Sequence, residues 1–394
     1  MKKITTLLTA IIGMAFMNQV SATHVTVEVP TAGQLSSSVQ NANCDSITIS
    51  GNLDGNDFWF IREQMPNLIY LNIGKVTVPD NKLPESGLYS KKALQKIILP
   101  DNLGTIGNHA FAYCSNLKDI TFPKSLVTIE YNAFYQSGLS EAILPENLKE
   151  IGDGVFYECY NLEKVTFPKT LVTIGNNAFR QCNLSEITLP DSLKTIGNNA
   201  FRYCQQLQKV TFPEKLKTIG TYAFSDCFRL HTTTLKGKTA PAISDNTFNY
   251  TKVFYVPEGA AQTYKDASNW SNLIIIDGNT PKKITVTLTT AGTLGEEILK
   301  QVNYVKQVNE LVINGPLNND DFYQIQQQAT NLIAIDLTGA TIESLPENFF
   351  YERTALLDIK LPTTLKSIGR YAFYRCYGLT QITIPEGVTN IKDH

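Results

Sequence analysis

Residues 99–121 read LPDNLGTIGNHAFAYCSNLKDIT, and this pattern repeats along the chain. Its proline returns with a period that alternates between 23 and 22 residues, at Pro100, Pro123, Pro145, Pro168, Pro190 and Pro213. The shorter repeats lose their residue at one place, just before the next leucine slot, which is typical of a loop between fixed positions. A period of this length with Leu and Ile at fixed slots predicts a solenoid whose turns bury their apolar faces against one another.

Each repeat gives its apolar residues fixed roles. The spacing Leu117-x-x-Ile120-x-Phe122 predicts a short strand, and the proline that follows cannot donate to a ladder, so it ends that strand. We expect Ala110-Phe111 and its copies to fill the core from the opposite wall. The glycine after each isoleucine is expected to turn the backbone with a positive φ. It stands at Gly107, Gly152, Gly175, Gly197 and Gly220.

These slots resemble the leucine-rich repeats of the BspA-like type, found in bacterial surface proteins and some parasite surface proteins. The resemblance covers about residues 92–235 and 345–391, and Val256 to Trp270 looks like the C-terminal cap of such arrays. It implies an α/β, β-rich fold, a right-handed leucine-rich-repeat solenoid of 22–23-residue repeats. It also implies export and binding of proteins on other cells or in extracellular matrix, with no catalytic residues.

The chain then starts a second time. Ala32-Gly33-Gln34-Leu35 returns as Ala291-Gly292-Thr293-Leu294, and Leu294, Ile298 and Val302 predict an amphipathic helix. Each copy therefore opens with a strand–helix unit that caps its array. We expect a signal peptide (1–22), an N-terminal cap unit (23–97), a repeat array (98–237), a C-terminal cap and linker (238–280), a second cap unit (281–343) and a second array (344–394).

The second array is expected to be incomplete. Ile391 to His394 aligns with Ile106 to His109, so the sequence stops before the next Ala-Phe pair. An uncapped solenoid end exposes apolar side chains and strand edges. We therefore expect the sequence to be a fragment or a truncated product.

The first 22 residues predict export. Met1-Lys2-Lys3 is basic, Ile4 to Met17 is an apolar stretch of 14 residues, and Val20-Ser21-Ala22 offers small residues for cleavage. The alternative is a short buried helix. No other stretch reaches 18 apolar residues, so we expect no transmembrane segment in the mature chain and a place at the cell surface or outside the cell.

Composition argues against several functions. Lys and Arg number 34 against 36 Asp and Glu, so the net charge of −2 gives no global attraction to nucleic acid. Only four His are present, and no hydrolase, metalloprotease or nucleotide-binding fingerprint occurs. We expect no enzyme, no cofactor and no metal. Asp54-Gly55-Asn56-Asp57 invites a calcium-loop interpretation, but the matching Asn318 to Asp321 lacks the glycine, so an N-cap is favoured.

Six of the seven cysteines share one slot, three residues after the phenylalanine; they are Cys114, Cys159, Cys182, Cys204, Cys227 and Cys376. Because Ser137 fills that slot in one turn, buried free thiols are favoured over disulfides between turns or a metal site. Cys44 stands outside the column and is a candidate reactive thiol.

Two further columns belong to the strand surface. Glu141, Lys164, Glu186 and Lys209 alternate in sign on successive turns, so we expect pairing along the ladder. A threonine column lies beside them.

The slot directly after the phenylalanine carries the candidate site. It holds Tyr135, Tyr157, Arg180 and Arg202 on four successive turns, expected on the face opposite the strands, and Tyr113 and Tyr203 one slot further on widen it. Tyr and Arg are enriched in binding hot spots. The alternative is that these rings and guanidinia only stack on one another.

Two functions stay open for the whole chain. One is adhesion to extracellular or cell-surface proteins, with matrix proteins or glycans among the candidates. The other is a spacer or scaffold segment of a larger surface protein, with no ligand of its own. The sequence does not give an oligomeric state.

Overall fold

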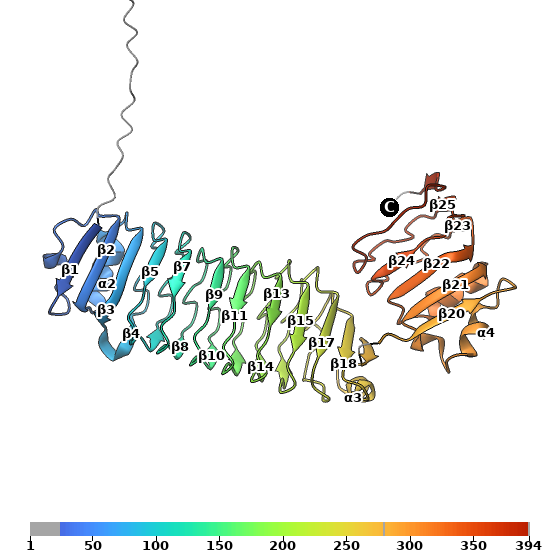
Figure 1. Cartoon of the computed structure of the whole chain (residues 1–394), viewed down its shortest axis with the longest axis horizontal. Helices are drawn as coiled ribbons and strands as arrows, with labels where there is room; N and C mark the ends of the chain where they lie inside the picture. The colour runs from blue at the N-terminus through green and yellow to red at the C-terminus, as the bar shows by residue number, and fades with distance from the viewer. Residues whose placement is uncertain (1–23, 279, 393–394) are drawn as a thin grey trace, which may run out of the picture.

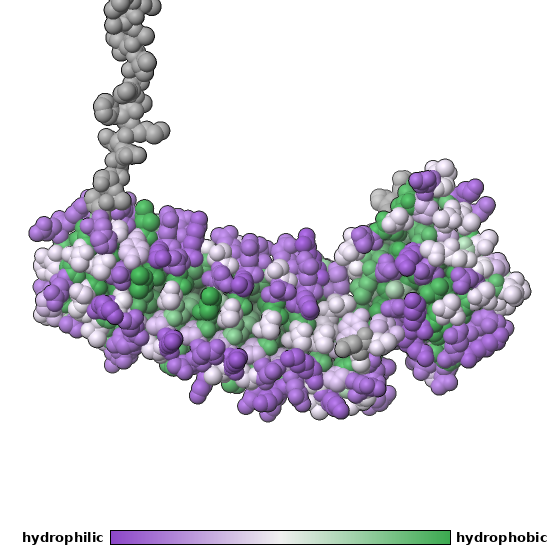
Figure 2. Space-filling view, in the orientation of Figure 1, coloured by the Kyte–Doolittle hydropathy of each residue, from purple (hydrophilic) through white to green (hydrophobic). Residues whose placement is uncertain are grey.

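The structure is a computed structural model that describes residues 24–278 and 280–392, so the expected signal peptide (1–22) lies outside the described part. Parallel strands follow one another along an elongated first unit, residues 24–277 (Figure 1). A second, shorter stack of strands forms a second unit, residues 283–392. On the face drawn in Figure 2, hydrophilic side chains gather along both long edges of the first unit and hydrophobic ones lie between them.

Two rows of parallel strands run along the first unit. The main row consists of β1 (His24–Val29), β2 (Ser46–Asn52), β3 (Tyr70–Thr77), β5 (Lys96–Ile98), β7 (Asp119–Thr121), β9 (Glu141–Ile143), β11 (Lys164–Thr166), β13 (Glu186–Thr188), β15 (Lys209–Phe212), β17 (Thr232–Leu235), β18 (Val253–Val256) and β19 (Ile274–Asp277). The second row consists of the two-residue strands β4 (Lys82–Leu83), β6 (Thr105–Ile106), β8 (Thr128–Ile129), β10 (Glu150–Ile151), β12 (Thr173–Ile174), β14 (Thr195–Ile196) and β16 (Thr218–Ile219). The sequence predicted only the main row, because a two-residue strand shows no alternation.

The second unit repeats the beginning of the first. One sheet orders β20 (Lys283–Thr287), β21 (Glu310–Pro316), β22 (Ala334–Thr341) and β24 (Asp358–Lys360), and the other orders β23 (Ser344–Leu345), β25 (Ser367–Ile368) and β26 (Asn390–Ile391). The β2–β3 and β21–β22 pairs both shift register at corresponding positions, between Thr48 and Ser50 and between Val312 and Asn314. This shared irregularity supports the expected duplication, while the segment boundaries stay a prediction.

Helices are short and sit between strands. They are α1 (Leu35–Ser38), α2 (Gly55–Gln64), α3 (Ala261–Asp266), α4 (Leu294–Leu299) and α5 (Asn319–Tyr323), with the helical turns η1 (Pro79–Asn81), η2 (Val305–Gln307) and the π-helical η3 (Gln324–Gln328). The predicted amphipathic helix is shorter than expected. Leu294 and Ile298 belong to α4, whereas Val302 follows its end and is buried all the same.

A stack of phenylalanine rings forms the core of the first unit. Neighbouring rings are nearly parallel, with centroids 5.0 to 5.5 Å apart. The stack comprises Phe111, Phe134, Phe156, Phe179, Phe201, Phe224 and Phe248. The role predicted for the Ala-Phe pairs is therefore confirmed.

The predicted role of the glycine column is wrong. Gly107, Gly152, Gly175, Gly197 and Gly220 do not have a positive φ. They are needed for close approach, because a Cβ on Gly220 would lie 2.5 Å from the backbone of the preceding turn. The left-handed residues lie two and six positions after the glycine, as at His109 (φ 54) and Tyr113 (φ 62).

The Asp54 segment caps a helix, as the sequence favoured. Asp54 and Asn318 accept backbone N–H groups at the start of α2 and α5, which begin at Gly55 and Asn319. The buried Asp57 also accepts from the backbone N–H of Gly33 at 2.6 Å and of Leu35 at 2.8 Å. Asp321 makes the same two bonds to Gly292 and Leu294. In both copies, the repeated Ala-Gly-x-Leu segment is therefore hydrogen-bonded to the repeated aspartate at the start of the next helix.

The cysteine column is buried and its thiols are free. Cys204 Sγ donates to the carbonyl oxygen of Phe179, one turn earlier, at 3.1 Å, and the other column thiols make the equivalent bond. The suggestion that Cys44 is reactive is wrong. Its side chain is fully buried, and burial together with the neighbouring Asp45 raises the pKa of its thiol, so it stays protonated.

Each unit has its own hydrophobic core, and a third small cluster joins them. Val253, Ile274 and Ile276 point away from the core of the first unit and pack with Ile333 and Ala355 of the second. The ring centroids of Tyr250 and Tyr377 lie 5.3 Å apart across the same contact.

Candidate functional site

The four residues of the candidate site form a row that we call the Tyr/Arg stripe: Tyr135, Tyr157, Arg180 and Arg202. Each directly follows a ring of the phenylalanine stack, and each is half-buried. Backbone bonds fix their spacing, because the N–H of the residue after each stripe member donates to the carbonyl of the next member, as Gln136 does to Tyr157 at 3.0 Å. The stripe lies in the turns that lead from the second strand row back to the main row. The sequence analysis expected the stripe on the face opposite a single row of strands. Each turn instead has two strands, so that expectation describes the position of the stripe only in part.

The stripe and its neighbours contact one another continuously. The ring centroids of Tyr113 and Tyr135 lie 5.1 Å apart, as do those of Tyr135 and Tyr157. The Arg180 guanidinium carbon lies 5.2 Å from the Tyr157 ring centroid and 5.7 Å from that of Tyr203. All six predicted residues therefore lie in one row, because Arg202 also lies 4.7 Å from the Tyr203 ring. The stacking alternative is consistent with these contacts, and a binding role stays a prediction.

A carboxylate that the sequence analysis did not identify anchors the tyrosine half. Glu158 accepts from Gln136 and from the Tyr135 hydroxyl, the latter at 3.2 Å. Burial favours the protonated form of Glu158, but hydrogen bonds from Gln136, Tyr157, Tyr160 and Tyr135 outweigh it and lower its pKa. Burial and the charge of Glu158 raise the pKa of the Tyr135 hydroxyl, so it remains a neutral donor.

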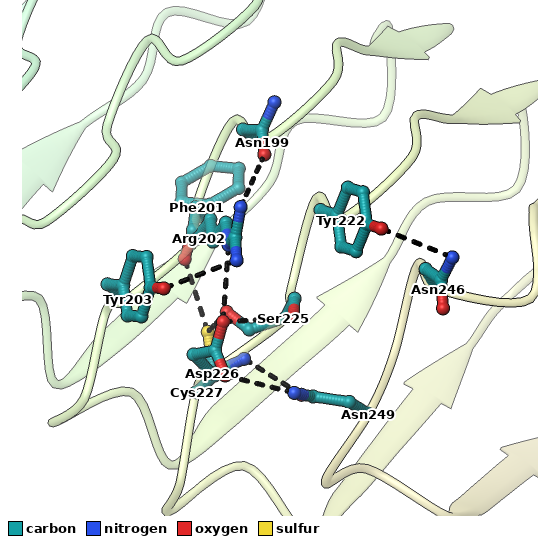
Figure 3. Close-up of polar contacts among 10 residues, drawn as sticks. All are labelled: Asn199, Phe201, Arg202, Tyr203, Tyr222, Ser225, Asp226, Cys227, Asn246 and Asn249. Carbon is teal, nitrogen blue, oxygen red and sulfur yellow. Dashed lines mark hydrogen bonds and ion pairs between the residues drawn. The ribbon is translucent and has the colours of Figure 1, made fainter.

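A second carboxylate anchors the arginine half (Figure 3). Arg202 Nε lies 3.2 Å from Asp226 Oδ2, and Arg202 also donates to the Tyr203 hydroxyl at 3.2 Å. The guanidinium carbon of Arg202 also lies over the Tyr222 ring, 4.8 Å from its centroid. Arg180 differs, because its buried Nε has no hydrogen-bond partner among the described residues.

The sequence held signals for these missed residues. Glu158 and Asp226 occupy one repeat slot, two after the phenylalanine, together with Gln136, Gln181 and Tyr203. The second array carries its own stacked pair in the slot after the phenylalanine, since Tyr351 and Tyr374 have centroids 5.2 Å apart. Reading the same slot in both arrays would have found this pair.

The alternating charge column lies on the main strand row, as expected. Glu141 is the register partner of Lys164, and their side chains form an ion pair at 2.9 Å. Glu186 is the register partner of Lys209. Neighbouring carboxylates are thus matched with lysines rather than grouped around a cleft.

Two structural features bear on metal binding and membrane insertion. Residues 24–278 and 280–392 contain no group of three or more His, Cys, Asp or Glu side chains placed to hold a metal ion. Within the same residues, no helix has the length and apolarity that a bilayer crossing requires.

Comparison with known proteins places the repeats in a family. The family described as "BspA type Leucine rich repeat region" matches residues 81–192, 172–286 and 304–394, in six copies. No curated protein matches the chain.

Solved leucine-rich-repeat structures are similar at low identity. A leucine-rich repeat protein from Bacteroides ovatus is 21% identical, with 82% of this chain and 80% of that chain covered and a TM-score of 0.37. A leucine rich cell surface protein from Faecalibacterium prausnitzii is 19% identical, with 93% and 87% covered and a TM-score of 0.39. The pneumococcal vaccine antigen PcpA is 19% identical, with 82% and 84% covered and a TM-score of 0.32. The repeats of the family match well over half of this chain, so the chain belongs to the BspA-type leucine-rich-repeat family.

Proposed function

We propose that this chain is exported and acts at the cell surface or outside the cell as a non-catalytic protein that binds other proteins through the Tyr/Arg stripe. The observation that carries the proposal is the continuous row from Tyr113 to Arg202, which crosses five turns of the array. Tyr and Arg are, with Trp, the side chains most enriched among binding hot spots at interfaces. The expected partners are extracellular or cell-surface proteins, matrix proteins included.

The side chains of the row are preorganised for binding. Its rings and guanidinia are already held by their neighbours and by Glu158 and Asp226, so docking a partner orders few side chains. A half-buried tyrosine presents one edge to solvent while the rest of its ring is packed, which suits contact with another protein surface.

A binding screen followed by one pair of variants tests the proposal. The mature chain is screened against extracellular and matrix proteins, and Tyr135, Tyr157, Arg180 and Arg202 are then changed to Ala. The fold is expected to persist, because Ala112 and Ser225 fill the same slot in other turns. Affinity for the identified partner should fall at least roughly tenfold, about 1.4 kcal/mol.

The matched control changes the strand-face charges Glu141, Lys164, Glu186 and Lys209 to Ala and should leave affinity within about threefold, since exposed ion pairs contribute little. If the control abolishes binding and the stripe variant does not, the strand face is the site.

A spacer function is the second candidate, and one observation favours it. The polar groups at both ends of the stripe are satisfied internally, by Glu158 and by Asp226. A spacer would show no saturable binding in the screen, and the stripe variant would then change only stability.

A further inference from the structure

A groove of about 1270 Å³ lies where the two units meet. In Figure 1 the two units meet at a corner, with α3 and β18 on one side and β20 on the other. The first unit contributes α3 and the segment before β19, and the second contributes the start of β20, η2 and the loops before β22 and β24. Ligand sites occur preferentially at such junctions.

Positive charge is concentrated in this groove. Six basic side chains line it against two carboxylates, Asp277 and Glu352. The basic residues are Lys252, Lys265, Lys282, Lys283, Lys306 and Arg353. One of the two carboxylates is already engaged, because Glu352 pairs with Arg375 at 2.8 Å. The excess stands out in a chain whose net charge is −2.

The five lysines are available to a ligand. None of them forms an ion pair within the part of the chain that the structure describes. Arg353 is different, because its guanidinium donates to the carbonyl oxygens of Ile325, Gln326 and Ala329, so it adds charge while holding the C-terminal part of η3.

Of the five lysines, Lys252 has the ammonium group that a bound anion would stabilise most, because it is the one that is partly desolvated. It is half-buried on the strand side of the groove, and burial lowers the pKa of its ammonium group. A bound anion would offset this desolvation by direct Coulomb attraction, which is stronger in a partly buried groove than on an open surface.

The remaining lining favours a hydroxyl-rich ligand over a peptide. Ser271, Asn272 and Thr280 offer exposed hydroxyl and amide groups. The apolar lining residues Ile274, Ile276, Leu332 and Ala355 are buried, so the apolar surface that a ligand meets includes the exposed Tyr304 ring and the stems of the lysines. Lysine is a point charge on a flexible stem and suits anionic groups spaced along a flexible chain.

We propose that this groove binds an acidic polysaccharide, whose sulfate or carboxylate groups contact Lys252, Lys265, Lys282, Lys283 and Lys306. The site is separate from the Tyr/Arg stripe, so it stands or falls independently of the proposed function.

The test uses the full mature chain and defined probes. Heparin represents sulfated glycans and polygalacturonate represents carboxylated ones, while dextran, poly-glutamate and duplex DNA are comparison ligands. We expect saturable binding to heparin or polygalacturonate, and the stronger of the two identifies the anionic group. Dextran should not bind.

Matched variants locate the site. Changing the exposed Lys265, Lys282, Lys283 and Lys306 to Gln should weaken glycan binding at least roughly tenfold. Changing four exposed lysines of the array, Lys118, Lys149, Lys194 and Lys217, to Gln removes the same charge and should weaken it less than about threefold. Lys252→Gln alone should also weaken binding, and the four-residue stripe variant should leave it unchanged.

Several results would overturn the proposal. Equal losses in the two lysine variants would show that the whole surface attracts the probe by charge alone. Tighter binding of poly-glutamate or DNA than of either glycan would assign the groove to an acidic peptide or a nucleic acid. Absence of saturable glycan binding would reject the site outright.

Discussion

Arg202 Nε donates to Asp226 Oδ2 at 3.2 Å, so the last guanidinium of the stripe is tied to the following turn. Asp226 is itself fixed, because its Oδ1 accepts from Asn249 at 3.0 Å and Asn249 in turn accepts from the Asp226 backbone N–H at 2.8 Å. The charge that anchors the arginine half of the stripe comes from a residue in the left-handed region, Asp226 at φ 61.

Asp226→Asn tests this anchor. Asn tolerates the left-handed region, removes the charge and leaves one acceptor oxygen where Asp226 has two. We expect the free energy of unfolding in urea to fall by about 1 kcal/mol, between the value of an exposed ion pair and that of a buried charged hydrogen bond. Asp191→Asn is the control, because its pair with Lys236 is largely exposed, and it should cost less than about 0.5 kcal/mol. If both variants lose the same free energy of unfolding, the ion pair of Asp226 with Arg202 contributes no more than an exposed pair.

Much of the fold could be predicted from the sequence because each turn repeats the same contacts. The phenylalanine stack, the strand slot that includes Ile120 and the thiol column were all readable, since one side-chain type recurs at one slot. The stripe was readable for the same reason. Repetition turns a weak local signal into a strong one.

Other features were missed or had no repeated signal. The left-handed position two residues after the glycine slot is held by Asn132, Gly154, Asn177 and Asn199, residue types that tolerate a positive φ, but the sequence analysis assigned the turn to the glycine instead. The contact of Ile333 with Ile274 joins residues from different units, and no period relates them. The groove arises from that contact, so only the three-dimensional structure brings Lys252 close to Lys306.

The column thiols should resist alkylation in the folded protein. Burial raises the pKa of Cys114, Cys159 and Cys204 to about 12 each, so the reactive thiolate is scarce as well as inaccessible. Iodoacetamide should label few cysteines before denaturation, and six or seven in denaturant without reductant. Mass shifts that show two or more disulfides would contradict the free-thiol column.

The buried thiols should lower stability in alkali. In the unfolded chain Cys159 and Cys204 lose their protons near a pKa of 9, whereas burial raises the pKa of both thiols to about 12 in the folded chain. The unfolded state then binds fewer thiol protons, so the contribution of these thiols to the free energy of unfolding falls as the pH rises from about 9 toward 12. Cys204→Ser should make the melting temperature less sensitive to pH over the accessible part of that range, pH 9 to 10.5. An unchanged dependence would show that other groups dominate.

Lys91 and Arg353 perform the same task in the two copies, so one should substitute for the other. Lys91 is buried and donates to the carbonyl oxygens of Met65 and Arg62, as Arg353 donates to three carbonyls after α5. Lys91→Met should lower the free energy of unfolding by about 1–3 kcal/mol, because it leaves buried carbonyls unsatisfied.

The conservative variant Lys91→Arg should retain most of that stability. Burial lowers the pKa of Lys91 to about 8, so between about pH 8 and 10.5 the unfolded state binds the extra proton and Lys91 makes stability rise with pH. That rise should be absent in Lys91→Arg. If Lys91→Arg destabilises as much as Lys91→Met, the two residues are not equivalent.

The contact between the units should depend on Ile333. Its side chain is 3% exposed and belongs to the joining cluster rather than to the core of the second unit. Ile333→Asp places a charge among Val253, Ile274 and Ile276, which costs more than separating the units. We expect both cores to stay folded while the segment 277–282 is cleaved by protease at least roughly tenfold faster, which corresponds to about 1.4 kcal/mol of easier opening. Ile69 is the matched control, because it follows Asn67-Leu68 as Ile333 follows Asn331-Leu332, but it is 40% exposed. Ile69→Asp should leave the cleavage rate unchanged; equal acceleration by both variants would mean that the units are held together elsewhere.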